Sequence, residues 1–542
     1  MNSRIVGTVS ALALALAACG PLEDATSSGG AHQADYAASG LIARSLPEIA
    51  QALRDGETTS EALVSAYIAR IEEVDWAGPE LRSVLALNPD ALDDARAADA
   101  ARAAGEALGP LHGVPILLKD NIESADPVAT TAGALALAEN VTGRDSPLVA
   151  GLRAAGAIIL GKTNLSQWAN YRSRDSVSGW SALGGQVRNP HMLDRSPCGS
   201  SSGSGAAVAA SLAAGAVGTE TNGSIICPSQ VNGIVGFKPT VGLVSQQYIV
   251  PISSSQDTAG PMTKTVTGAA MMLNAMATGE ARTDYVAALD ANALQGARIG
   301  VARWAQGSNA DIIAHFNAAL DAMEAAGAVL VEIEDYEPPA ENLGADYRNI
   351  GRYEFKATLN HYLSEAAPAV ETRTLSELIA FNEAHADVEL ALFDQSIFED
   401  SVQTSGLDDP EYIASRDRAQ RATREQGIDF LMAEYDVDLL VSPSGPVASR
   451  IDPVNGDVWP AWAGIGSMAA IAGYPHASVP MGTVHGVPIG VSFIAGKDQD
   501  AAVLSYAYAY EQATRLRPDP QYLPSAEARP EIARAMRGTL RE

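Results

Sequence analysis

Between Gly113 and Gly242, short apolar runs alternate with alanine-rich segments, and this alternation limits the folds open to the chain. The runs VPILL and AIILG have the length of buried strands, and the segments between them have the composition of helices. A sheet flanked by helices satisfies both patterns. Strand-like runs return near the C-terminus as DLLVSP and SFIAG, so we expect the chain to rejoin the same sheet. The predicted fold is α/β, with one large domain over residues 45–542.

Residues 282–436 interrupt this rhythm. Long charged segments such as IIAHFNAALDAMEAAG and ASRDRAQRATREQGIDFLMAEY are typical of helices. We therefore predict a helical excursion here, packed over one side of the core. The length of 542 residues would allow three or four domains, but the return of strands after the excursion favours a single one.

The N-terminus has the organisation of a secretory leader. Arg4 precedes an apolar stretch up to Ala17, which is shorter than the ~20 residues that a helix needs to cross a bilayer. The letters LAAC ending at Cys19 resemble a bacterial lipobox, in which the cysteine is lipidated, and ordinary cleavage at an Ala-x-Ala site is the alternative. We predict a signal peptide over 1–18 and a lipidated, flexible tether over 19–44. The protein would then be extracytoplasmic, in the periplasm or cell envelope, with the lipid anchor as its membrane contact.

Charge and cysteine content exclude several classes of partner. The formal net charge of −29 would repel a nucleic-acid backbone, so no nucleic-acid partner is expected. Apart from Cys19, the cysteines are Cys198 and Cys227, which either form a disulfide or remain free, because their spacing does not decide. Two cysteines do not make a zinc site unaided, and no HExxH or CxxC pattern is present. We expect no metal and no organic cofactor.

Two loops rich in glycine and serine lie within residues 196–240. The first, CGSSSGSG, is followed by an alanine-rich run that should form a helix from near Ser204, so that the loop amides lie at a helix N-terminus. The second, GTETNGSI, again places small residues around one serine. A single loop of this kind would be interpreted as a linker. Two such loops joined by an apolar helix indicate a site where the backbone approaches a ligand.

Lysine is rare in this chain, since surface positive charge is carried mostly by arginine. Lys119 directly follows the apolar run VPILL and precedes Asp120, a setting that would bury it at the end of a strand. Burial can make a lysine neutral, whereas an arginine stays charged. Lys119 is therefore a candidate base, and a structural ion pair with Asp120 is the alternative.

The segments GVPILLKDNI, GKTNLSQWAN, CGSSSGSGAAVAA, GTETNGSIICPS, GFKPT and SQDTAGP occur in the order found in the amidase-signature family. On these motifs the chain is identified as a member of that family, from about Ser45 to the SFIAGKDQDAAVLSYAYAYEQAT segment. The resemblance implies a single α/β/α domain around a large mixed sheet. It also implies hydrolysis of carboxamides through an acyl-enzyme.

Residue by residue, the resemblance places the nucleophile on Ser224, the bridging serine on Ser200 and the base on Lys119. In the family, a cis peptide bond precedes the bridging serine, here after Gly199. A neutral lysine would take a proton from the bridging serine, which accepts one from the nucleophile. Asp257 is interpreted as a hydrogen-bonding support. The candidates for the oxyanion hole are the backbone amides of Ser224 itself and of Thr221, Asn222 and Gly223.

Within the family, the segments NLSQWANYRS and SGWSALGGQVRNP are most like those of peptide amidases, which remove ammonia from C-terminal carboxamides of peptides. A small-molecule or peptide amide is the expected substrate. The alternatives are an amidase for aryl or fatty-acid amides, a non-catalytic substrate-binding lipoprotein and a component of the tRNA-dependent amidotransferase, the last disfavoured by the leader and the acidic charge. The aromatic candidates for an acyl pocket, for each of which ordinary core packing is the simpler interpretation, are Trp168, Tyr171, Trp459 and Trp462.

Overall fold

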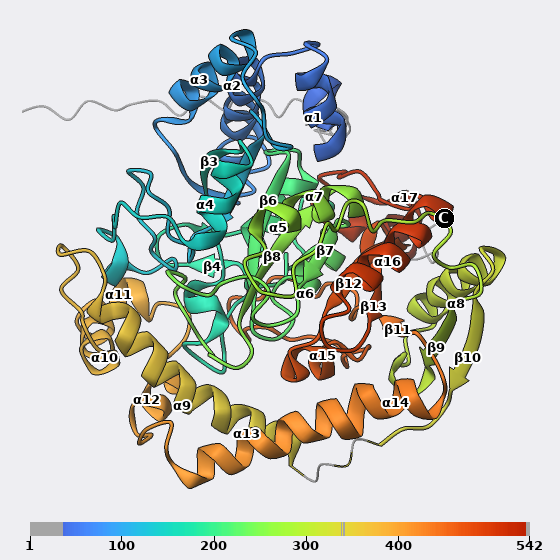
Figure 1. Ribbon diagram of the computed structural model, residues 1–542. Helices are drawn as coiled ribbons and strands as arrows, with labels where there is room; N and C mark the ends of the chain where they lie inside the picture. The colour runs from blue at the N-terminus through green and yellow to red at the C-terminus, as the bar shows by residue number, and fades with distance from the viewer. Residues whose placement is uncertain (1–35, 338, 340–341, 538–542) are drawn as a thin grey trace, which may run out of the picture.

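Eleven strands form one mixed sheet in the computed structural model, which describes residues 36–337, 339 and 342–537 (Figure 1). From one edge to the other, the strands are β1 (Val84–Leu87), β3 (Ile158–Thr163), β2 (Pro115–Lys119), β6 (Gly215–Glu220), β8 (Thr258–Thr263), β7 (Val235–Lys238), β12 (His476–Val484), β13 (Val487–Ile494), β11 (Leu439–Pro443), β9 (Arg298–Ala302) and β10 (Val329–Ile333). β2 runs parallel to β3 and β6, and β9 runs parallel to β10 and β11, whereas the other neighbours are antiparallel. A separate hairpin consists of β4 (Trp180–Ser181) and β5 (Gly185–Gln186).

Helices cover both faces of the sheet. A Cβ atom built on Gly215 of β6 would lie 2.8 Å from the sulfur of Met272, and one built on Gly218 would lie 2.8 Å from the Ser201 hydroxyl, on the opposite side. The first side carries α1 (Leu46–Arg54), α4 (Pro147–Ala154), α7 (Val266–Met276), α8 (Ala310–Ala325) and α16 (Asp500–Thr514), and the second carries α5 (Ser202–Ala209) and α6 (Ile226–Val231). The predicted α/β/α fold class is confirmed.

The N-terminal segment contacts the rest of the domain from a position earlier in the sequence than predicted. The tether expected over 19–44 is attached from Tyr36 onwards, because the Tyr36 ring meets the Tyr522 ring edge-on with centroids 5.9 Å apart. Arg70, the last residue of α2 (Ser60–Arg70), donates to the Tyr36 carbonyl at 2.9 Å. Composition alone could not reveal these contacts, since they join residues far apart in the sequence. The predicted signal peptide and Cys19 lie outside the described residues. Within those residues, no helix has the length and apolar composition of a membrane span.

The helical excursion predicted over 282–436 is shorter than expected. Its first part supplies β9 and β10 to the sheet, with α8 between them. These strands escaped the sequence analysis because they flank the charged helix α8, and β10, at the sheet edge, has one buried residue and lacks a continuous buried apolar run. The helices of the excursion proper are α9 (Leu343–Ser364), α10 (Leu375–Ala384), α11 (Ala386–Glu389), α12 (Ser396–Val402), α13 (Pro410–Thr423) and α14 (Asp429–Glu434).

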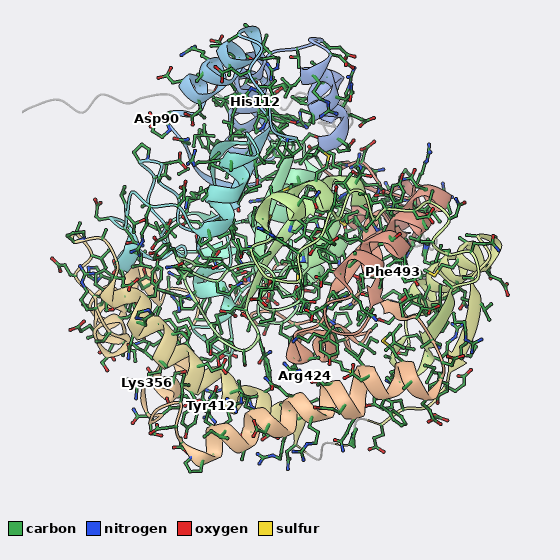
Figure 2. All side chains as sticks on the ribbon, in the orientation of Figure 1. Asp90, His112, Lys356, Tyr412, Arg424 and Phe493 are labelled. Carbon is green, nitrogen blue, oxygen red and sulfur yellow. A yellow bond between two sulfur atoms is a disulfide. The ribbon has the colours of Figure 1, made fainter. Side chains whose placement is uncertain are left out.

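These excursion helices pack against one another and against the core through buried contacts. Tyr412 of α13, labelled in Figure 2, stacks on Tyr353 of α9, and the ring centroids are 5.7 Å apart. Arg172 forms a fully buried ion pair with Glu389 at the end of α11, at 3.3 Å. The remaining helices are α3 (Ala91–Ala103), α15 (Gly466–Ala472) and α17 (Pro530–Arg537), with 3-10 or π turns at Gly40–Ala43, Ile71–Asp75, Leu135–Leu137, Gln167–Asn170, Arg303–Ala305, Arg424–Ile428 and Ala526–Ala528. The excursion helices therefore pack along one end of the sheet (Figure 1).

Candidate active site

Lys119 is the last residue of β2, and its side chain is fully buried. Its nitrogen lies 2.8 Å from Ser200 Oγ, 2.8 Å from Thr219 Oγ1 and 3.2 Å from the Thr219 carbonyl oxygen. Burial lowers the pKa of Lys119 to about 7, although the charges of Asp257 and Glu220 act in the opposite direction. Near neutral pH, a substantial fraction of this lysine is therefore uncharged and able to accept a proton. These contacts do not include an ion pair with Asp120, which was the alternative interpretation.

Ser200 lies in the loop that leads into α5, and its peptide bond with Gly199 is cis. A Cβ atom at position 199 would fall 2.1 Å from Ser166 Oγ, so only glycine fits there. The Ser166 N–H donates to the Ser200 carbonyl at 3.1 Å, and the Ser200 side chain is fully buried. The helix that follows begins at Ser202, two residues before the predicted start.

Ser224 lies in the loop between β6 and α6, and it is half-buried. The Ser201 N–H donates to the Ser224 carbonyl at 3.2 Å, which joins this loop to the one that carries Ser200. Glu220, the last residue of β6, accepts the N–H groups of Ile225 and Ile226 on one carboxylate oxygen at 2.8 and 3.0 Å. The structure thus brings Lys119 and Ser200 into contact and places Ser224 on the adjoining loop.

The other predicted oxyanion-hole residues precede Ser224, and the side chains of Thr221 and Asn222 hold two of them in place. Thr221 donates its hydroxyl to Asp257 at 2.6 Å, and Asn222 donates to the Ser467 hydroxyl at 3.0 Å. Gly223 has a φ of +82°, a conformation that favours glycine. Across the part of the chain that the structure describes, the N–H groups of residues 222–224 donate to no protein acceptor. They are therefore available to a ligand oxygen.

Cys198 and Cys227 form a disulfide, with their Cα atoms 5.9 Å apart. This decides the question that the sequence left open. Cys198 precedes Ser200 by two residues, and Cys227 follows Ser224 by three. The disulfide is therefore a covalent bond between the two serine loops, in addition to the backbone hydrogen bond between them.

A cavity of about 520 Å³ adjoins both loops. Gly199 from one loop and Asn222 from the other lie in its wall, together with the disulfide. Trp462, which is 47 % exposed, and Ser467 of α15 line it from the C-terminal part of the chain. A cavity of this size accommodates a small amide or the end of a peptide.

The four aromatic candidates divide into two groups. Trp462 lines the cavity, and Trp459 packs edge-on against it with centroids 5.8 Å apart. Trp168 is 2 % exposed and packs against Phe398, and Tyr171 packs against a neighbouring phenylalanine in the same apolar cluster. Core packing is therefore the correct interpretation for Trp168 and Tyr171.

The sequence analysis missed Thr219 and Glu220, although both lie in the GTETNGSI segment that it singled out. Thr219 supplies two of the three acceptors around Lys119, and Glu220 holds the loop after β6. Attention to the carboxylate beside the small residues could have indicated Glu220. Asp257, predicted as a support, also accepts the backbone N–H of Ile252 at 2.7 Å.

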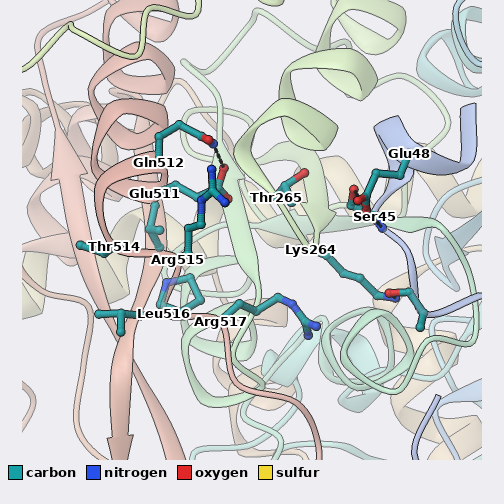
Figure 3. Close-up of a pocket in the computed structure, with 13 residues that line it drawn as sticks. Ser45, Glu48, Lys264, Thr265, Glu511, Gln512, Thr514, Arg515, Leu516 and Arg517 are labelled. Atoms are coloured by element: carbon teal, nitrogen blue, oxygen red, sulfur yellow. Dashed lines mark hydrogen bonds between the residues drawn. The ribbon is translucent and has the colours of Figure 1, made fainter. Parts of the chain in front are cut away.

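A second cavity, of about 430 Å³, is lined by residues outside these loops, among them Lys264, Glu511 and Arg517 (Figure 3). The Lys264 nitrogen donates there to the carbonyls of residues 42–44 at 3.0 to 3.2 Å and to the Ser211 hydroxyl at 2.7 Å. Glu511 accepts the Val266 N–H at 2.9 Å. Because these buried charged groups hold the fold together, we assign this cavity no chemistry.

The sequence model that describes the amidase family matches residues 62–504. The chain belongs to the amidase family. A putative amidase of Arthroderma benhamiae is 35% identical over 499 residues, which cover 86% of this chain and 81% of that one. A probable amidase of Arabidopsis thaliana is 34% identical over 498 residues, covering 88% and 91%. The family predicted from the motifs is confirmed.

Solved structures extend this likeness to the fold of this amidase. The native peptide amidase from Stenotrophomonas maltophilia is 45% identical, with a TM-score of 0.82, over 88% of this chain and 98% of that one. A peptide amidase in complex with the competitive inhibitor chymostatin matches with a TM-score of 0.84 at the same identity and coverage. Amide hydrolysis is the activity common to this family.

We expect the double variant Cys198→Ser, Cys227→Ser to be less stable than the wild type by about 3–4 kcal/mol, because the disulfide closes a loop of 29 residues. Urea unfolding without reductant measures this difference. Amide turnover should fall as well, since the serine loops lose their covalent connection. Reductant should lower the stability of the wild type and leave the variant unchanged. Equal urea midpoints for the two proteins would contradict the assignment.

Proposed function

We propose that this amidase hydrolyses C-terminal carboxamides of peptides to the free acid and ammonia, through an acyl-enzyme on Ser224. The observation that carries the proposal is the buried contact between Lys119 and Ser200 beside the loop of Ser224. The 45% identity to a peptide amidase, over nearly the whole length of that enzyme, supports the substrate class.

The proton relay follows from the contacts of Lys119. A neutral amine has two protons and one lone pair. The amine donates its two protons to the carbonyl oxygen and the hydroxyl oxygen of Thr219, and that hydroxyl oxygen also accepts from Asn121 at 3.0 Å. Its lone pair then faces Ser200, which transfers its proton to the amine and accepts the proton of Ser224 as that hydroxyl attacks the amide carbon.

The attack turns the carbonyl oxygen into an oxyanion that the N–H groups of residues 222–224 can stabilise. The C–N bond then breaks, and the relay returns its proton through Ser200 to the departing nitrogen, which leaves as ammonia. Water next attacks the Ser224 ester and gives its proton to the same relay. The acid is released, and Ser224 regains its hydroxyl proton.

The pH dependence of kcat/KM should report on Lys119. Since the lysine acts when neutral and its pKa is about 7, kcat/KM should fall about tenfold per pH unit below that value. The charge of Asp257 raises the pKa of Lys119, so Asp257→Asn should move this limb of the profile to lower pH. The exposed Asp436, changed to Asn, is the matched control and should leave the limb in place. A limb that stays fixed or moves upward in Asp257→Asn would exclude Lys119 as the base.

The substrate class is tested by following ammonia release from a peptide amide, its free acid, an aryl amide and a fatty-acid amide. The peptide amide should be hydrolysed most efficiently, and hydroxylamine should divert part of the product to the hydroxamate. Ser224→Ala should reduce turnover by about 10⁴-fold or more, while the urea midpoint stays near that of the wild type. Efficient hydrolysis of aryl or fatty amides without ammonia from the peptide amide would exclude the peptide class and leave the serine mechanism in place.

We further propose that the protein is a secreted lipoprotein, anchored through Cys19 on the extracytoplasmic side of a membrane. The LAAC motif and the short apolar stretch before it support this proposal, and a disulfide between Cys198 and Cys227 suits an oxidising compartment. Cys19→Ser should move the protein from the membrane fraction to the soluble extracytoplasmic fraction. Absence of labelled palmitate on the wild-type protein would count against the anchor.

A further inference from the structure

Two buried polar atoms without a protein partner, Glu220 Oε1 and His476 Nδ1, belong to residues that line the 520 Å³ cavity. The side chains are 2 % and 0 % exposed, and neither atom has a hydrogen-bond partner anywhere in the described residues. Buried polar atoms in folded proteins almost always have a partner. Two of them in the wall of one cavity beside the catalytic loops indicate a ligand group that would supply hydrogen-bond donors.

Both atoms are acceptors. Glu220 Oε2 already accepts two backbone N–H groups, which leaves Oε1 for the cavity. His476 Nε2 lies 2.6 Å from the Ser492 hydroxyl, and Ser492 donates its own proton to Ser444 at 2.9 Å. The imidazole must therefore donate from Nε2. Because burial lowers the pKa of His476 to about 3, the ring is neutral and Nδ1 has a free lone pair.

The charges around the cavity also favour a cation. Glu220 and Asp257 are the carboxylates whose charges act on Lys119, and that lysine is neutral when it serves as base. Lys238 is the other buried cation that Glu220 influences, and burial lowers its pKa to about 8. Among the described residues that line the cavity, Glu220 is the one carboxylate, and none has a cationic side chain. The rest of the wall is partly apolar, through Ile226, Trp462 and the disulfide.

We propose that this cavity is a specificity subsite for a guanidinium or ammonium group of the substrate, with Glu220 as the residue that selects it. The proposal rests on the proposed function, since it defines which peptide amides the enzyme prefers. A long basic side chain fits the arrangement, because its apolar stem would lie along Trp462 and Ile226 and its charged end would meet the carboxylate.

The kinetic test compares the amides of N-acetyl-arginine, N-acetyl-citrulline and N-acetyl-norleucine. Citrulline has the shape of arginine without the charge. In the wild type, kcat/KM should be at least tenfold higher for the arginine amide than for the citrulline amide. Glu220→Gln retains an oxygen for the backbone N–H groups and removes the charge, so this ratio should fall to about one. The ratio is unaffected by a general loss of activity.

Asp257→Asn is the matched control, because Asp257 is a buried carboxylate near Lys119 that does not line this cavity. It should leave the preference for the arginine amide unchanged. Equal kcat/KM for the arginine and citrulline amides in the wild type would overturn the proposal.

A binding measurement separates this proposal from the proposed function. In thermal unfolding, n-butylguanidinium should raise the Tm of the wild type, whereas the neutral n-butylurea should not, and Glu220→Gln should lose the response. If no peptide amide is hydrolysed, the proposed function fails, and the Tm measurement alone then tests the cationic subsite. Absence of a Tm shift with n-butylguanidinium would then overturn the cationic subsite.

Discussion

The contact between Lys119 and Ser200 depends on a strand that water cannot reach. Every residue of β2 is buried, because parallel strands flank it and helices cover the sheet on both faces. The same burial that costs the lysine its hydration lowers its pKa into the working range of a base. A lysine on the surface of this sheet would stay protonated and could not accept the serine proton. The large core is therefore a condition for the proposed chemistry.

The direction of the strands explains why the site lies where it does. β2 and β6 are parallel neighbours in the interior of the sheet. Lys119 and Glu220, each the last residue of its strand, therefore lie at the carboxyl ends of these strands, on the same side of the molecule. The two serine loops meet on that side, joined by the Ser201 to Ser224 hydrogen bond and by the disulfide. Ligands of open α/β sheets commonly bind at such carboxyl ends. The topology thus supplies the position, and β2 and the two loops supply the proposed reacting groups.

The residues around this site come from distant parts of the chain. The proposed proton-handling residues come from β2 and the loop before α5, within the first half of the chain. The cavity wall is completed by Trp462, Ser467 and His476, which lie more than 200 residues later. The cavity wall therefore forms only when the C-terminal part of the chain packs against the serine loops.

The sequence by itself determined the α/β class, the family and the positions of Lys119, Ser200 and Ser224, because these depend on local runs and motifs of a few residues. Only the tertiary structure decided that Cys198 pairs with Cys227, that Tyr36 packs on Tyr522 and that β9 and β10 join the sheet. It also revealed the roles of Thr219 and Glu220. Each of these features depends on burial or on a contact between distant segments, and sequence spacing does not specify the distances that such contacts require.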